Sequence, residues 1–223
     1  MLKRRLRTAG KLLQQDRALA RAAKRMPRPA PWEWVRPRLV PLLAGPSFDP
    51  PGEGLVRAAT SIGCAVEFGV DLGGVHARVD RQVAERWECT PEQLLAAALA
   101  NLDRRLAKLT PADVSGGAFS GRMIQRLERP GGCAASIVLL PDHLIRLFGE
   151  HDQVFAVPSR STLVSFPIEM PPSVLADAIV EMEMDEPLPL LYDPFVLLDG
   201  RLRWQPDDDE PGFAEQARDW PAA

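Results

Sequence analysis

The sequence is poor in the residue types that build metal centres and disulfide frameworks. It has three cysteines and three histidines among 223 residues, with no CxxC pair and no comparable ligand spacing. The thiols of Cys64, Cys89 and Cys133 are therefore expected to be reduced, and to act as small buried side chains in a cytoplasmic protein. We expect no metal and no cofactor, because the histidines are scattered along the chain.

Long apolar runs and the short motifs of common enzyme classes are also absent. No segment reaches the roughly 18 consecutive apolar residues that span a bilayer. There is no glycine-rich phosphate loop, no GxSxG, no HExxH and no internal repeat. Catalytic residues are therefore unknown from motifs, and the balance of the sequence favours a protein that is not an enzyme.

Charge is distributed very unevenly along the chain. The formal net charge is −3, yet residues 1–28 contain ten Lys or Arg and a single acid, Asp16. Residues 205–223 form an acidic tail around Asp207-Asp208-Asp209-Glu210. With the prolines at 27, 29 and 31, this predicts a basic arm (1–28), a proline-rich linker (29–35), one domain (36–204) and the acidic tail.

The basic arm is predicted to be an amphipathic helix that ends before Pro27. Apolar residues recur at spacings of three, four and seven, with Lys and Arg around the remaining surface. Such a helix can contact an anionic membrane surface weakly, dock on a protein, or pack on the acidic body. It also resembles an organellar transit peptide. The acidic body disfavours nucleic acid as a partner.

The first predicted hairpin of the body is formed by residues 64–71 and 75–80. A two-residue turn at Gly73-Gly74 pairs Val70 with Ala77 and Phe68 with Val79, so that apolar side chains share one face. The same register pairs Asp71 with His76. We interpret these two as a pair on a solvated face, because no nucleophile is predicted beside them; an acid/base dyad is the alternative.

A helix is predicted to begin at Thr90. Thr90 is the N-cap, Pro91 occupies the first helical position, and Gln93 completes a capping box. Leu95, Leu99, Leu102 and Leu106 then form the predicted buried stripe. Asn101 beside this stripe is expected either to bond the backbone of a neighbouring loop or to contact a ligand.

Several shorter elements complete the prediction. Residues 111–117 are expected to be a loop, 134–140 a central strand, 141–148 a helix with Asp142 as cap, and 173–182 a helix capped by Ser173. Asp199-Gly200 predicts a hairpin that places Phe195 opposite Trp204. Hairpins separated by helices, without regular βαβ alternation, indicate an α+β fold with a largely antiparallel sheet.

The candidate binding residues lie in the segment 154–166, VFAVPSRSTLVSF. It predicts two buried strands joined by a polar loop at Pro158-Ser159-Arg160-Ser161. Arg160 with the hydroxyls of Ser159, Ser161 and Thr162 can hold a carboxylate or phosphate through charge-assisted hydrogen bonds. The alternative is a tight turn whose hydroxyls satisfy its own backbone.

Five segments in order resemble an uncharacterised bacterial family, the domain-of-unknown-function family fourteen forty-four. They are Leu39-Val40-Pro41, TPEQLLAAALANLDRRL, CAASIVLL, VFAVPSRSTLVSF and FVLLDGRLRW. The resemblance covers roughly residues 36–204. Its most specific parts are Ala-x-x-Asn-Leu ending at Leu102 and the Pro-Ser-Arg turn, where Ser161 stands in place of the usual acid. It implies a small cytosolic protein and no particular activity.

Three functions are consistent with these observations. The first is a non-enzymatic binding or adaptor domain for a protein partner or a small anionic ligand. The second is an enzyme of unrecognised type, in which Arg160 stabilises an anion and His143 or His151 acts as a base. The third is a membrane-surface or docking protein that acts through residues 1–28.

Overall fold

The computed structural model describes residues 17–24, 26–44, 54–129, 133–186, 189–190 and 192–204. Within them the chain folds as α+β, as predicted, with antiparallel sheets. Most of the predicted arm (1–16) and the acidic tail (205–223) lie outside the described residues. Residues 17–23 are helical, and this helix ends before Pro27 as expected.

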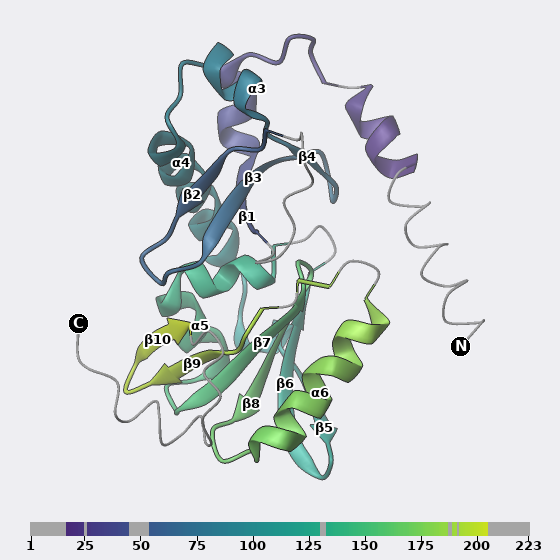
Figure 1. Ribbon diagram of the computed structural model, residues 1–223, viewed down its shortest axis with the longest axis vertical. Coiled ribbons are helices and arrows are strands. Elements are labelled where there is room, and N and C mark those ends of the chain that lie inside the picture. The colour runs from purple at the N-terminus through teal and green to yellow at the C-terminus, as the bar shows by residue number, and fades with distance from the viewer. Residues whose placement is uncertain are drawn as a thin grey trace.

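Two sheets organise the described chain (Figure 1). The first contains β1 (Leu39–Leu43), β2 (Arg57–Ala59), β3 (Ala65–Asp71) and β4 (His76–Arg78), in the order β1-β3-β2 with β4 also paired to β3. The second has the order β10-β9-β7-β8-β6-β5, from β5 (Ser115–Phe119), β6 (Arg122–Glu128), β7 (Gln153–Ser159), β8 (Thr162–Pro167), β9 (Phe195–Leu198) and β10 (Arg201–Trp204).

Helices cover both sheets. They are α2 (Trp32–Val35), η1 (Arg36–Arg38), α3 (Arg81–Arg86), α4 (Pro91–Leu106), η2 (Pro111–Asp113), η3 (Ala135–Leu139), α5 (Pro141–Phe148) and α6 (Pro172–Asp185). In Figure 1, α3 and α4 accompany the first sheet, and α6 lies across the second. α2 lies within the segment predicted as a proline-rich linker, and Val35 at its end is fully buried.

The continuous apolar character of β7 follows from burial on both faces of the second sheet. Val154 and Ala156 belong to the cluster under α6, whereas Phe155 and Val157 belong to the main core. Successive side chains of a strand point to opposite faces, so a strand covered on both sides needs no polar alternation. The main core also contains residues of β1, β3 and α4, and therefore joins the two sheets.

The predicted hairpin registers are confirmed. In the first sheet Val70 pairs with Ala77 and Asp71 with His76. In the second sheet Phe195 pairs with Trp204, across a turn in which Asp199 and Gly200 both have positive φ. The N-cap of α4 at Thr90, with its capping box, is confirmed as well. We also expect the Trp204 side chain to be buried, but this side chain lies outside what the structure describes.

Segment 134–140 was predicted to be a strand, and this prediction is wrong. It forms the 3-10 helix η3, whose backbone N–H at Ala135 donates to the carbonyl of Arg160. A short apolar run does not distinguish a buried strand from a buried helix. The two alanines at 134 and 135 disfavour a strand.

The predicted buried face of α4 is displaced. Leu94, Ala98, Asn101, Leu102 and Leu106 are buried, whereas Leu95 and Leu99 are only partly covered. Alanine and leucine surround much of this helix, so the pattern allowed two adjacent stripes that share Leu102 and Leu106. Packing against β1 and η3 selects the stripe that begins at Leu94.

Other corrections concern segment 111–117 and two helix caps. The predicted loop contains η2 and the start of β5, which pairs with β6 in a hairpin that the sequence did not reveal. Its strand is rich in glycine and serine and largely exposed, so it lacks the apolar alternation of a typical strand. Asp142 lies in the first turn of α5 but does not cap it, and Pro171 rather than Ser173 precedes α6.

Candidate functional site

A row of polar side chains runs along one face of β3 and its neighbours. Glu67 and Asp71 lie four residues apart on this face, opposite Arg57 of β2 and His76 of β4 respectively. Arg78 of β4 lies opposite Gly69, between these two pairs. The face was predicted to be solvated, and this is wrong: Glu67 is only 3% exposed, because the second sheet approaches it.

Glu67 is held by three arginines from three different elements. Its Oε1 lies 3.1 Å from the Nη2 of Arg57, and its Oε2 lies 3.3 Å from the Nη2 atoms of both Arg78 and Arg160. Arg160 comes from the β7–β8 turn, so its ion pair connects the second sheet to the first. The Arg160 guanidinium also donates to the carbonyl of Leu43 of β1, at 3.4 Å.

The ion pair of Arg160 with Glu67 separates the guanidinium from the hydroxyls of the predicted Pro-Ser-Arg site. The hydroxyl of Ser159 bonds that of Ser161 at 3.1 Å and that of Thr162 at 3.3 Å, so the hydroxyls bond one another. Arg160 points away from them toward Glu67. The residues are adjacent, but their polar groups do not converge on a common anion position, and ligand binding by them stays a prediction.

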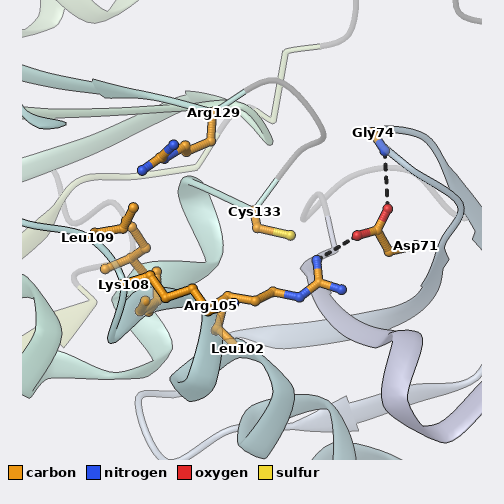
Figure 2. Close-up of a pocket in the computed structure, with 10 residues that line it drawn as sticks. Asp71, Gly74, Leu102, Arg105, Lys108, Leu109, Arg129 and Cys133 are labelled. Carbon is orange, nitrogen blue, oxygen red and sulfur yellow. Dashed lines mark hydrogen bonds and ion pairs between the residues drawn. The ribbon is translucent and has the colours of Figure 1, made fainter.

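A separate cavity of about 440 Å³ lies beside the polar row (Figure 2). α4 and the residues that follow it supply Leu102, Arg105, Leu106, Lys108 and Leu109. The β3–β4 turn supplies Asp71 and Gly74, and the segment between β6 and η3 supplies Arg129 and Cys133, with Ile137 beyond. The cavity therefore combines an apolar wall with three cationic side chains and one carboxylate.

The cations differ in how far they are neutralised. Arg105 Nη1 lies 2.7 Å from Asp71 Oδ2, and Arg129 Nη2 lies 3.0 Å from Asp113 Oδ1. Lys108 is exposed and makes no ion pair among the described residues. Lys108 therefore contributes a positive charge that nothing described at the cavity offsets.

Asp71 keeps its charge in this setting. Burial by itself would raise the pKa of its carboxyl, but the N–H groups of Gly74 and Gly73 and the Arg105 guanidinium lower it below its ordinary value. Oδ1 accepts from Gly73 at 2.8 Å and from Gly74 at 3.1 Å. Both oxygens are thus occupied, and among the described hydrogen bonds none joins Asp71 to His76.

A thiol lies next to the histidine, contrary to the expectation that no nucleophile would. The Sγ of Cys133 is 4.0 Å from the Nε2 of His76. Burial raises the pKa of the Cys133 thiol to about 11, although Arg105 opposes the rise. Burial lowers the pKa of His76, and Arg105 and Arg160 add to this while Asp71 opposes it. Both groups are therefore neutral near pH 7.

The remaining predicted residues lie elsewhere. The Asn101 amide donates to the carbonyls of Arg36 at 2.7 Å and Leu39 at 2.8 Å. These hydrogen bonds fix the backbone at the start of β1. His143 bonds Asp103 at 2.7 Å and Arg146 at 2.9 Å. No described contact brings His143 or His151 to Arg160.

Sequence reasoning did not identify Arg105, Lys108, Arg129 and Cys133 as residues of one site. The available signal was the spacing Leu102, Arg105, Leu106, Leu109, which puts one arginine on an otherwise apolar strip of helix. Nothing in the pattern showed that the β3–β4 turn would face it.

No family model, curated protein or solved structure matches this chain. The resemblance to family fourteen forty-four therefore stays a prediction. In the part of the chain that the structure describes, no group of three or more His, Cys, Asp or Glu is arranged to hold a metal ion. Across the same residues, no helix has both the length and the apolar character needed to cross a membrane.

Proposed function

We propose that this protein is a non-enzymatic binding domain for a small anionic ligand with an apolar body. The observation that carries the proposal is the cavity bounded by Arg105, Lys108 and Arg129, which gathers three cations against one carboxylate. A cytoplasmic setting is part of the proposal.

The charge distribution supports an anionic ligand. Arg105 is compensated by Asp71 and Arg129 by Asp113, so these arginines are held in place with donors left over. Lys108 adds a positive charge that no described carboxylate at the cavity neutralises. A carboxylate, sulfonate or phosphate group near these three side chains gains charge-assisted hydrogen bonds that a neutral group does not.

The size and the apolar wall support a ligand larger than an inorganic ion. A volume of about 440 Å³ lies within the range of small-molecule pockets, roughly 300–1,000 Å³. Among the apolar lining residues, Leu106 and Leu109 keep a small exposed area, and Leu102 and Ile137, which are fully buried, lie behind that surface. This favours an amphiphilic organic anion.

The test is a fluorescence titration of the full-length protein with 8-anilinonaphthalene-1-sulfonate, an organic anion with an apolar body. We expect saturable binding that the Lys108→Met variant weakens about fivefold, the effect of one charge-assisted contact on a partly solvated site. Lys24→Met is the matched control, because Lys24 is an exposed lysine on the helical segment 17–23 and its adjoining turn, and lines no part of the cavity.

Two results would contradict the proposal. One is the absence of saturable binding by a protein whose circular dichroism shows it to be folded. The other is equal binding by the Lys108→Met and Lys24→Met variants, which would place the dye outside this cavity.

A further inference from the structure

The cavity contains a nucleophile that anion binding does not require. Cys133 lines it together with Arg105 and Arg129, and the Cys133 thiol lies 4.0 Å from the imidazole of His76. In Figure 2 the thiol points toward the Arg105–Asp71 pair, while Lys108 and Arg129 lie on its other side. Of the three cations, Arg105 is therefore the one whose guanidinium lies on the side that the sulfur faces (Figure 2), and an anion that Arg105 holds is brought next to the sulfur.

We propose that Cys133 is a covalent modification site for low-molecular-mass disulfides that carry carboxylates, a proposal that rests on the anion-binding function of the cavity. The disulfide is first held through its carboxylates by Lys108, Arg105 and Arg129. The Cys133 sulfur then attacks the nearer sulfur of the bound molecule.

The exchange balances without any further reagent. A bond forms between the Cys133 sulfur and one sulfur of the disulfide, the original S–S bond breaks, and the other half leaves as a thiolate. The protein sulfur is oxidised and the departing half is reduced, so the disulfide itself is the oxidant. The thiol proton passes to the neutral imidazole of His76 and from there to solvent.

Selectivity arises from binding rather than from an intrinsically reactive thiol. With the pKa of Cys133 raised to about 11, its thiolate is scarce at neutral pH, so random encounters with disulfides are unproductive. Holding the disulfide beside the sulfur raises its local concentration, and His76 accepts the proton as attack begins.

The other two thiols serve as internal comparisons. Cys64 is 1% exposed in the core. Cys89 is partly exposed, and its Sγ lies 3.3 Å from the carbonyl of Trp87 rather than in the cavity. Cys89 is expected to react with disulfides in simple proportion to their concentration, with no preference for negative charge.

The experiment compares two chromogenic disulfides on the full-length reduced protein. One is 5,5′-dithiobis(2-nitrobenzoate), which carries two carboxylates, and the other is neutral 4,4′-dithiodipyridine. The released thiolate is followed by absorbance, and the modified cysteine is identified by mass spectrometry of peptides. We expect the rate at Cys133 to saturate with the anionic probe, and this saturable phase to be absent from Cys133→Ser and retained in Cys89→Ser.

Two variants test the assigned roles. Lys108→Met should lower the rate with the anionic probe about fivefold and leave the neutral probe unaffected, because only the former uses the charge. His76→Gln should slow both probes at neutral pH, with the difference vanishing as the pH approaches the pKa of the thiol. The inference is overturned if the reaction rate at Cys133 rises linearly with the concentration of the anionic probe. It is also overturned if Cys133 and Cys89 show the same preference for the anionic over the neutral probe.

Failure of this inference is distinguishable from failure of the proposed function. Cys133→Ser should still bind 8-anilinonaphthalene-1-sulfonate, because the cations and the apolar wall remain. If dye binding is intact in the wild type while Cys133 shows no saturable reaction, anion binding stands and the modification site is refuted.

Discussion

The carboxylate of Glu67 is expected to be the most sensitive charged group of the described fold. It is 3% exposed and lies between the guanidinium groups of Arg57, Arg78 and Arg160, at 3.1 to 3.3 Å. Replacing Glu67 with Gln keeps the shape and removes the charge. The three arginines then face one another without their shared counterion.

The size of the expected stability loss follows from the burial of Glu67. Removing one partner of a buried ion pair typically costs about 3–5 kcal/mol of unfolding free energy, because the charge left behind stays desolvated. The arginines here are between 27% and 37% exposed and regain some hydration, which favours the lower end of that range. We therefore expect Glu67→Gln to lose about 3 kcal/mol.

Urea unfolding followed by circular dichroism measures this loss. With a slope of about 2–3 kcal/mol per molar urea, the midpoint should fall by about 1 M or more. Glu128→Gln is the matched control, because Glu128 pairs with Arg126 but is 60% exposed, and such surface pairs contribute about 0–1 kcal/mol. A loss below about 1 kcal/mol for Glu67→Gln would refute the reasoning, since the carboxylate would then not be the counterion on which the arginines depend.

Three further predictions concern stability. Leu94→Ala should lower the free energy of unfolding by about 2–5 kcal/mol, because Leu94 is fully buried. Leu99→Ala, on the partly covered face of α4, should lower it by about 1 kcal/mol. Equal losses in urea unfolding would contradict the assigned helix face. Burial lowers the pKa of His76 below its ordinary 6.5, so the unfolded state binds more protons between the two values and stability falls as the pH drops through about 6.5. His76→Gln should flatten that part of the stability profile, and an unchanged profile would rule His76 out as its source. Gly200→Ala should lower the free energy of unfolding by about 1 kcal/mol, because Gly200 has a φ of +73°; thermal unfolding with no loss would exclude strain at this turn.

Local patterns predicted the elements whose ends are marked by specific turn or cap chemistry. Gly73-Gly74 and Asp199-Gly200 each identified a hairpin with its register, because two-residue turns leave little freedom in pairing. Thr90, Pro91 and Gln93 identified the start of α4, since these side chains satisfy backbone donors of their own helix. The two strands of segment 154–166 were predicted from their apolar runs, although β7 extends through Ser159 and so includes Pro158, which was predicted to lie in the loop.

Other elements depended on what packs against them. Segment 134–140 is apolar in either a strand or a helix. Its two alanines are a weak local sign against a strand, and the contacts of η3 with β1, α4 and α5 add the tertiary part of the choice. The glycine-rich β5 has little strand character of its own and is ordered by pairing with β6. Leu94 and Ala98 are buried in place of Leu95 and Leu99, because α4 is rotated slightly about its axis, and no local residue specifies this rotation.

The candidate site shows the same division. The sequence by itself determined the hairpins at Gly73-Gly74 and Asp199-Gly200, the start of α4 and the α+β class, because turn residues, caps and side-chain periodicity act over a few neighbouring residues. Tertiary structure alone decided that Arg160 reaches Glu67 and that Lys108, Arg129 and Cys133 share a cavity. Those residues come from segments far apart in the chain, and their meeting depends on how two sheets pack, which no local spacing encodes.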